Sequence, residues 1–409
     1  MTQPITTQCC IAGGGPAGMM LGFLLARAGV DVVVLEKHAD FLRDFRGDTI
    51  HPSTLELMYE LGLLDEFLKL PHQKVSALGA RFGKTAYKFA DFSHLPTHCR
   101  FIAMMPQWDF LDFIAGQGQR YPNFHLKMRA EATDLLFDGS GVAGVRAETP
   151  DGPLDVRAAL TVGCDGRHST VRARADLVPQ DFGAPMDVLW FRLSRRPSDN
   201  LATGGVFDKG RIFVMIERGE YWQCAYVIAK GSMDAVRQRG IEEFRAQVAA
   251  TEPGFTDRVD EIAGWDQVHL LTVTVNRLPK WHRPGLICIG DAAHAMSPVG
   301  GVGVNLAVQD AVAAANILAD PLYERRDPTP FLPKIQSRRE FPTRMTQKLQ
   351  IAMQNTVISG ALKGGKDFRA PFPLRLFDEY AYLRRIPARL VGVGVRPEHV
   401  QTPERAPQS

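Results

Sequence analysis

The stretch QCCIAGGGPAG, residues 8–18, decides the fold class of this chain. It begins as a short apolar run, typical of a buried parallel strand, and continues at once into the GxGxxG glycines Gly13, Gly15 and Gly18. Residues 19–35 supply good helix formers and then the apolar run VDVVVL. The pattern therefore predicts a strand, a helix and a second parallel strand, which is the unit that binds dinucleotides.

Each glycine of this pattern meets a steric requirement of a nucleotide site. The first permits a tight turn, the second lets the backbone approach a pyrophosphate, and the third lets the helix pack close to the strand. The free N–H groups at the helix start then face the phosphates. Glu36 closes the second strand 18 residues after Gly18, near the position where an acid accepts bonds from ribose hydroxyls. A second GxGxxG match, at 139–144, lies between β-like segments, and we interpret it as a hairpin loop.

Two later segments repeat the arrangement of a strand that runs into glycines. Residues 286–311 begin as the apolar run LICI, pass through GDAAHAMSPVGGVGVN and continue as a helix. The start of this helix offers free N–H groups, and Asp291 could accept bonds from sugar-like hydroxyls. Residues 161–172, TVGCDGRHSTVR, end a strand at Asp165 and Gly166, a pair that is also common in plain turns.

In order and spacing, these three motifs resemble those of the single-component FAD-dependent monooxygenases of the para-hydroxybenzoate hydroxylase type, over roughly residues 5–320. The resemblance implies that the first motif and Glu36 hold the ADP half of FAD, and that Asp291 binds the ribityl chain. It also implies that residues 303–305 approach the isoalloxazine and that the Asp-Gly motif serves both FAD and the nicotinamide nucleotide. The full predicted cofactor set is Gly13, Gly15, Pro16, Ala17, Gly18, Glu36, Lys37, Arg46, Gln107, Asp165, Gly166, Asp291, Pro298, Gly301, Gly303, Val304 and Asn305.

Arg46, Gln107 and Pro298 are included in this set because of the resemblance. Arg46, in FRGD, and Gln107, in MPQWDFL, match positions where the family uses an Arg and an Arg or Gln beside the flavin. The alternative for each of them is a surface position. Pro298 is the catalytic candidate, because the family places this proline beside the substrate. We assign no general base among the eleven histidines, and we interpret His294, within the third motif, as support for its loop.

The predicted fold is α/β, with a Rossmann-like FAD-binding domain, an inserted and mostly antiparallel β-sheet substrate domain, and C-terminal helices. Alternating apolar residues at 211–217 and 221–228, joined by a short turn, predict a hairpin in the inserted sheet. The predicted boundaries are 1–72, 101–179 and 278–325 for the FAD-binding domain, 73–100 and 180–277 for the substrate domain, 326–395 for a C-terminal helical segment, and 396–409 for a polar tail.

One face of this hairpin is expected to line the substrate cavity, although alternation alone does not tell which face. The pocket candidates are Phe213, Met215, Trp222, Gln223 and Pro298. The alternative for the hairpin residues is ordinary core.

The C-terminal segment carries a cluster of basic residues, namely Arg338, Arg339, Arg344 and Lys348. Glu340 lies among them, and several glutamines follow. We therefore interpret the cluster as the solvated face of a helix over 341–358 rather than as a nucleic-acid site.

The composition excludes several function classes. The 48 basic and 45 acidic residues give a formal net charge of +3 and no reason to expect a nucleic-acid partner. Six cysteines without CxxC spacing predict neither a metal site nor a disulfide framework, and they fit a cytoplasmic location. Residues 2–26 carry no charge, but their glycines and the absence of a basic flank argue against stable membrane insertion.

The resemblance implies an oxidoreductase in which NADH or NADPH reduces FAD and O₂ then forms a flavin C4a-hydroperoxide. One oxygen atom passes to a small aromatic or heteroaromatic substrate, so the predicted protein is an aromatic hydroxylase, a monomer or a homodimer. The alternatives are a flavin-dependent reductase or halogenase of the same fold, and a flavin-binding sensor without turnover. None of the five tryptophans lies in the WxWxIP pattern of the halogenases.

Overall fold

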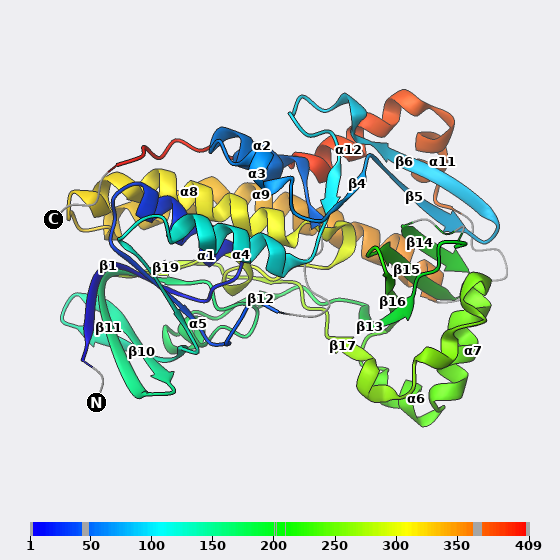
Figure 1. Ribbon diagram of the computed structural model, residues 1–409, viewed down its shortest axis with the longest axis horizontal. Coiled ribbons are helices and arrows are strands. Elements are labelled where there is room, and N and C mark those ends of the chain that lie inside the picture. Colours follow the sequence, from blue (N-terminus) through cyan, green and yellow to red (C-terminus); the bar gives the residue numbers. More distant parts are fainter. Residues whose placement is uncertain are drawn as a thin grey trace.

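The computed structural model describes residues 3–42, 49–199, 201, 203–208, 210–362 and 370–405. Two large sheets lie toward opposite ends of an elongated molecule, and the long helices α8 (Gly303–Tyr323) and α9 (Leu332–Met353) run between them (Figure 1). The predicted α/β fold class, with a parallel sheet and a separate antiparallel sheet, is confirmed.

The first sheet has the strand order β19-β20-β11-β1-β2-β8, and β10 and β9 continue it from β11. Its strands are β1 (Ile5–Ala12), β2 (Val32–Glu36), β8 (Phe124–Met128), β9 (Glu131–Asp138), β10 (Gly141–Thr149), β11 (Gly152–Gly163), β19 (His282–Arg283) and β20 (Leu286–Cys288). Parallel pairing joins β1 to both β11 and β2, β2 to β8, and β11 to β20. The strand order therefore reverses at β1, and such a reversal opens a ligand crevice at the carboxyl ends of the strands.

The second GxGxxG match is a hairpin loop, as predicted. Strands β9 and β10 pair in antiparallel fashion on either side of residues 139 and 140. A lone glycine pattern therefore marked a turn here, whereas the N-terminal match stands between β1 and α1 (Pro16–Arg27).

The second sheet has the order β17-β13-β16-β15-β14-β5-β6. Its strands are β5 (Ala77–Phe82), β6 (Thr85–Asp91), β13 (Met186–Ser194), β14 (Gly204–Asp208), β15 (Arg211–Glu217), β16 (Tyr221–Ala229) and β17 (His269–Leu271). The predicted hairpin is confirmed as the antiparallel pair β15 and β16. The parallel pair of β14 with β5 brings residues 77–91 into a sheet formed otherwise by residues 186–271.

The remaining elements are short strands and helices. The short strands are β3 (Thr49–Ile50), β4 (Gln73–Val75), β7 (Ile102–Met104), β12 (Gln180–Asp181) and β18 (Asn276–Arg277). The other helices are α2 (Pro52–Glu60), α3 (Leu64–Phe67), α4 (Gln107–Gly118), α5 (Thr170–Arg174), α6 (Met233–Gln238), α7 (Ile241–Thr251), α10 (Ser359–Leu362), α11 (Phe372–Glu379) and α12 (Arg385–Gly392).

Helices α1 and α8 pack against each other in the largest apolar core, which also contains β1, β2 and β11. The segment Val299–Tyr323, which includes α8, is the described helix long and apolar enough to cross a membrane, and 72% of its most apolar window is buried inside the protein. Burial against other elements accounts for an apolar helix of this length.

The first C-terminal helix begins earlier than predicted. We expected 341–358, whereas α9 begins at Leu332 and passes through Pro342. A proline inside a helix removes one backbone hydrogen bond, and packing of α9 against α8 offsets that loss. Pro333 suits the first turn, where the missing N–H group has no partner to lose.

The prediction of a solvated face on this helix is wrong for part of the cluster. Arg344 and Lys348 are exposed, but Arg339 is buried. The glutamines on the same side of the chain are also buried, namely Gln347, Gln350 and Gln354. Hydrogen bonds and ion pairs compensate these polar side chains for the loss of water, so composition alone did not reveal their burial.

The described part of the predicted polar tail lies on the protein. The Arg405 N–H donates to the Arg27 carbonyl at 2.9 Å, and the Arg27 guanidinium donates to the Thr402 carbonyl at 2.8 Å. The tail thereby contacts the end of α1.

Candidate cofactor site

Three loops meet at the carboxyl ends of neighbouring parallel strands. The loops follow β1, β11 and β20, and they begin at Gly13, Cys164 and Ile289. Each is tied to the adjoining strand by its first N–H group: Gly13 donates to the Leu35 carbonyl at 2.8 Å, Cys164 to Ala12 at 2.7 Å, and Ile289 to Gly163 at 3.0 Å. The three sequence motifs therefore form one site, at the reversal of strand order.

The GxGxxG glycines hold the first loop and leave one place open. A Cβ on Gly13 would stand 2.4 Å from the Cys164 carbonyl oxygen, and its φ of +107° disfavours other residues. A Cβ on Gly18 would stand 2.0 Å from the Gly13 oxygen. At Gly15, which precedes α1, a Cβ would meet no atom within 4 Å. This open space beside the positive end of a buried helix fits the pyrophosphate of FAD.

Glu36 is buried beside the same loop. One carboxylate oxygen accepts the Gly14 N–H at 3.0 Å, and the other accepts the His38 N–H at 3.0 Å. These two bonds orient the carboxylate beside the first loop. The adjoining Lys37 differs: its side chain is 56% exposed and its amino group lies 3.9 Å from Glu131.

The two remaining candidates from the first half of the chain are less well placed. Arg46 lies outside the described residues. Gln107 is half-buried and forms the first residue of α4, which packs against α1.

The Asp-Gly motif is organised internally. The Asp165 carboxylate accepts the Ser169 hydroxyl at 2.5 Å and the Val171 N–H at 3.0 Å. Burial raises the pKa of Asp165, and these two bonds oppose the rise. Gly166 has a φ of +84° and a Cβ there would meet no atom within 4 Å. The carboxylate therefore shapes the loop, and the glycine leaves room for a ligand.

Asp291 presents a carboxylate to the site. Its side chain is 38% exposed, and it lies 3.9 Å from the Arg167 guanidinium. Arg167 belongs to the Asp-Gly motif, and the buried Arg172 of that motif donates to the Ala292 carbonyl at 3.0 Å. Contacts between the second and third motifs thus hold Asp291 while leaving it open to hydroxyl donors.

A buried network of charges supports the third motif from behind. His294 Nε2 lies 2.5 Å from Asp310, and Asp310 also accepts a bond from Arg339 Nε at 2.9 Å. Arg339 donates in turn to Glu398 at 3.1 Å. Although burial alone would raise it, His294 and Arg339 hold the pKa of Asp310 below its usual range. This geometry suits His294 as support for the loop.

The glycine-rich part of the third motif is fastened to α2. The Asn305 side-chain oxygen accepts the His51 N–H at 2.9 Å and the Thr54 hydroxyl at 2.7 Å. At Gly303 a Cβ would meet no atom within 4 Å, so space is open at the start of α8. The neighbouring Val304 is buried, whereas Pro298 and Gly301 are half-buried.

His51 is a feature that the sequence did not single out. Its ring is fully buried, and Nδ1 lies 2.7 Å from the Val391 carbonyl of the C-terminal segment. Burial lowers the pKa of His51 to about 4, so the ring is neutral at ordinary pH. Its only sequence signal was its place shortly after the FRGD segment.

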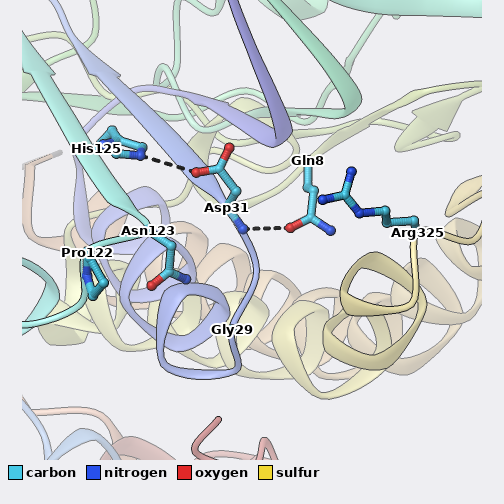
Figure 2. Close-up of a pocket in the computed structure, with 7 residues that line it drawn as sticks. All are labelled: Gln8, Gly29, Asp31, Pro122, Asn123, His125 and Arg325. Atoms are coloured by element: carbon cyan, nitrogen blue, oxygen red, sulfur yellow. Dashed lines mark hydrogen bonds and ion pairs between the residues drawn. The ribbon is translucent and has the colours of Figure 1, made fainter. Parts of the chain in front are cut away.

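A separate polar pocket of about 330 Å³ lies at the other end of the first sheet (Figure 2). Its walls include Gln8, Asp31 and Asn123, which stand at or near the amino ends of β1, β2 and β8. The His125 ring lies 3.2 Å from the Asp31 carboxylate there. This pocket is remote from the three motifs, which follow the carboxyl ends of the strands.

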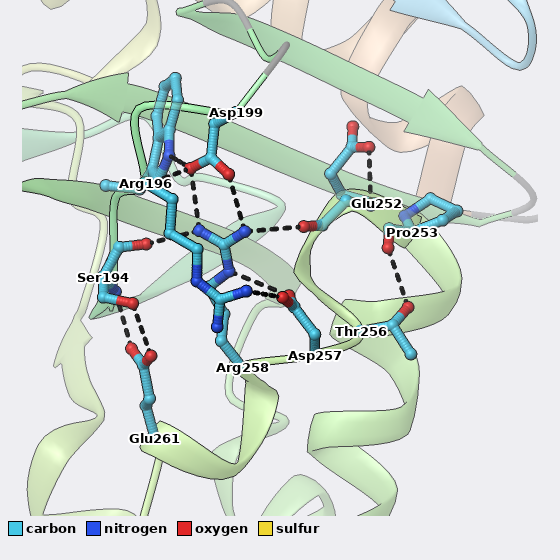
Figure 3. A network of polar contacts seen from close by, with 11 residues as sticks. Ser194, Arg196, Asp199, Glu252, Pro253, Thr256, Asp257, Arg258 and Glu261 are labelled. Atoms are coloured by element: carbon cyan, nitrogen blue, oxygen red, sulfur yellow. Dashed lines mark hydrogen bonds and ion pairs between the residues drawn. The ribbon is translucent and has the colours of Figure 1, made fainter.

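Three pocket candidates on the hairpin face away from the motifs. Phe213, Met215 and Trp222 are buried in one apolar cluster with Phe244 of α7 and Phe255. The Trp222 indole donates to Asp199 at 2.8 Å. Asp199 also pairs with the buried Arg258 in the network that Figure 3 shows. This face is a covered core, so we do not retain these three residues as pocket candidates.

The opposite face of the hairpin is the one beside the third motif. Gln223 is paired with Ile216 in the sheet and shares its face with Val214 and Ala225. Val214 and Trp190 pack in one cluster with Val299, the residue after Pro298. The alternation of residues along β15 and β16 correctly divided the hairpin into two faces. Which face lies beside the third motif became clear only from the packing of α7 against the opposite face.

Comparison with known proteins agrees with this geometry. The sequence pattern of the family described as "FAD binding domain" matches residues 6–348. The chain belongs to this family. FAD is therefore its cofactor, and the predicted resemblance to the single-component flavoprotein monooxygenases is confirmed.

Named relatives of this FAD binding domain protein include enzymes of two kinds. This chain is 30% identical over 359 residues to 6-methylpretetramide 4-monooxygenase from Streptomyces rimosus, and the match covers 86% of this chain and 85% of the relative. It is 26% identical over 319 residues to dialkyldecalin synthase from Streptomyces rugosporus, covering 74% of this chain but only 63% of the relative. The structure of p-nitrophenol 4-monooxygenase from Pseudomonas putida DLL-E4 has the same fold, with a TM-score of 0.77, 21% identity, and coverage of 94% and 97% of the two chains.

Proposed function

We propose that this flavoprotein is a monooxygenase that uses NADH or NADPH and O₂ to hydroxylate a small aromatic or heteroaromatic substrate. The observation that carries the proposal is the contact between the third motif and the second sheet. Val299 packs against the apolar cluster that also contains Ala225 and Val227 of this sheet face, so the loop that holds Pro298 shares that cluster with the sheet. An aromatic substrate between them would lie beside the cofactor loop.

Each of the following residues has a proposed role in binding FAD or in shielding the site from water. The open space at Gly15 and the start of α1 would receive the pyrophosphate, Glu36 would accept ribose hydroxyls, and Asp291 would accept ribityl hydroxyls. When bound, FAD supplies the redox chemistry with the nicotinamide and with O₂. The protein contributes orientation and the exclusion of water at Pro298 and at the apolar face with Trp190.

The named relatives support this proposal, and they do not all catalyse the same reaction. The Streptomyces rimosus relative is named as a 4-monooxygenase of 6-methylpretetramide, whereas the Streptomyces rugosporus relative is named as a dialkyldecalin synthase. The same fold thus serves different reactions, so activity has to be argued from substrate turnover. A reductase, a halogenase and a sensor without turnover are the other outcomes.

The test is oxidation of NADH and of NADPH by the FAD-loaded protein in air. The panel contains phenols, anilines, quinolines and 6-methylpretetramide, and products are analysed by mass. We expect one class of aromatic compound to accelerate oxidation and to gain about 16 mass units, the mark of one inserted oxygen. NAD(P)H oxidation without a change in product mass, or products that carry halogen, would contradict the proposal.

The state of the cysteines supports a cytoplasmic location for the proposed enzyme. All six cysteines are buried and free, as a reducing compartment permits.

A further inference from the structure

Three glutamines of the C-terminal segment face the loop that carries Pro298. Gln347 and Gln350 belong to α9, and Gln354 follows directly after it. Spacings of three and four residues place them on one helical face. All three are buried, which is unusual for glutamine and requires that their amides be hydrogen-bonded.

Each of these amides donates to the third motif. Gln347 donates to the Ala295 carbonyl at 3.1 Å and to the Asn276 carbonyl at 2.8 Å. Gln354 donates to the Ser297 hydroxyl at 2.6 Å. Together the three amides contact Ala295, Ser297 and Val299, and Ser297 is bonded by both Gln350 and Gln354.

Gln350 has the central position. Its amide nitrogen donates to the Ser297 carbonyl at 2.9 Å and to the Val299 carbonyl at 2.9 Å. These two residues flank Pro298, which has no N–H group of its own. The opposite orientation of the amide would set its oxygen against two carbonyl oxygens, so the two acceptors fix which atom faces the loop.

We infer that Gln350, flanked by Gln347 and Gln354, is a positioning residue that holds the Pro298 loop in the shape that FAD binding requires. The inference rests on the proposed cofactor site and gives the C-terminal helix a role in it. Without the amide, the carbonyls of the buried Ser297 and the half-buried Val299 would lose this donor, and the loop could turn them elsewhere. The position of Pro298 against the flavin ring would change with them.

The test compares Gln350→Leu with a matched control on the same helix, Gln336→Leu. Gln336 also makes two bonds to a neighbouring segment, accepting the Trp281 N–H at 3.0 Å and donating to the Pro279 carbonyl at 2.8 Å. Both variants lose two bonds from α9, but only the first of them loses contact with the Pro298 loop. The measurements are the FAD dissociation constant of the full-length apoprotein, the visible spectrum of bound flavin, and the melting temperature.

We expect Gln350→Leu to raise the FAD dissociation constant roughly tenfold and to shift the flavin absorption bands. The reason is that the two hydrogen bonds from Gln350 to the loop are lost. Both variants are expected to lower the melting temperature by similar amounts, because each loses two hydrogen bonds. Gln336→Leu is expected to leave the FAD affinity and the flavin spectrum unchanged. If Gln350→Leu does not fold, Gln354→Leu provides the comparison, with a weakening of roughly threefold for its one bond.

Two results would overturn the inference. One is unchanged FAD affinity and spectrum in Gln350→Leu, and the other is an equal loss of affinity in Gln336→Leu, which would reveal a general effect of stability. A wild-type protein that binds no FAD would instead overturn the proposed function itself, and the inference with it.

Discussion

At the scale of single residues, Glu36 shows how backbone donors prepare a carboxylate for a ligand. Its two oxygens accept the N–H groups of Gly14 and His38, which hold the carboxylate beside the first loop. Glu36→Ala is expected to weaken FAD binding by roughly 1–3 kcal/mol, the usual cost of unsatisfied polar partners. Titration of the apoprotein with FAD measures the change. Glu131→Ala, at a glutamate whose side chain is 58% exposed, is the control, and equal affinities of the two variants would count against the ribose role.

Asp291 is the second residue with a defined consequence. Its half-exposed carboxylate lies in the third motif, and we assign to it the ribityl hydroxyls. Asp291→Ala is therefore expected to purify with little flavin, measured as the ratio of flavin to protein. Asp176→Ala changes a carboxylate whose side chain is 89% exposed and should retain the wild-type ratio. Full flavin occupancy in Asp291→Ala would exclude the assigned role.

His51 links pH to stability. In the folded protein burial lowers its pKa from 6.5 to about 4, so the neutral ring is favoured. The unfolded chain takes up this proton below about pH 6.5, so the contribution of His51 to stability is full above that pH. It falls by up to about 1.4 kcal/mol per pH unit as pH drops toward 4.

Urea unfolding of His51→Gln across this pH range tests the assignment. The variant should show a shallower loss of stability than the wild type, because glutamine does not titrate. His125→Gln, at an exposed histidine, should follow the wild type. Parallel curves for His51→Gln and the wild type would contradict the assignment.

At the scale of elements, the hairpin β15–β16 could be predicted from alternation, but its covered face could not. Alternation is a local property, whereas the cover comes from α7 and from residues near Phe255, far away in sequence. The prediction of a solvated face on α9 is wrong for a different reason. Beyond Ile335 its buried residues are mostly polar and include Arg339, Gln347 and Gln350, so a pattern based on apolar residues treats this part as solvent-facing. Partners for these side chains come from segments that only the fold brings together.

A buried ion pair between Asp199 and Arg258 stabilises the covered face of the second sheet. Arg258 donates to both oxygens of Asp199, at 2.7 and 2.8 Å, and the side chains of both residues are buried. Asp199→Asn leaves the buried guanidinium without its buried counter-charge and should lower the free energy of unfolding by about 3 kcal/mol. Asp257→Asn changes a half-exposed partner of the same arginine and should have little effect. Denaturant unfolding compares the two variants, and equal stabilities would contradict the importance of the Asp199 pair.

At the scale of the whole molecule, the three motifs and their shared site could be predicted because each motif follows a short apolar strand. Parallel pairing of β20, β11 and β1 then brings the strand ends together. The packing of Val299 against the same apolar cluster as Trp190 and Val214 could not be predicted, since it depends on how distant segments come together in the fold. The same holds for Glu398, whose ion pair with Arg339 joins the last described segment to α9.

The central claim is that the open space at the reversal of strand order belongs to FAD, and substitution of Gly15 tests it most directly. A Cβ there meets no protein atom within 4 Å, and the φ of −76° suits other residues. Gly15→Val should therefore leave the melting temperature of the apoprotein unchanged while it blocks the approach of the pyrophosphate. The measurement is FAD titration of the wild-type and variant apoproteins. We predict one FAD per wild-type chain and none on a stably folded Gly15→Val chain, whereas equal FAD binding by the two proteins would contradict the account.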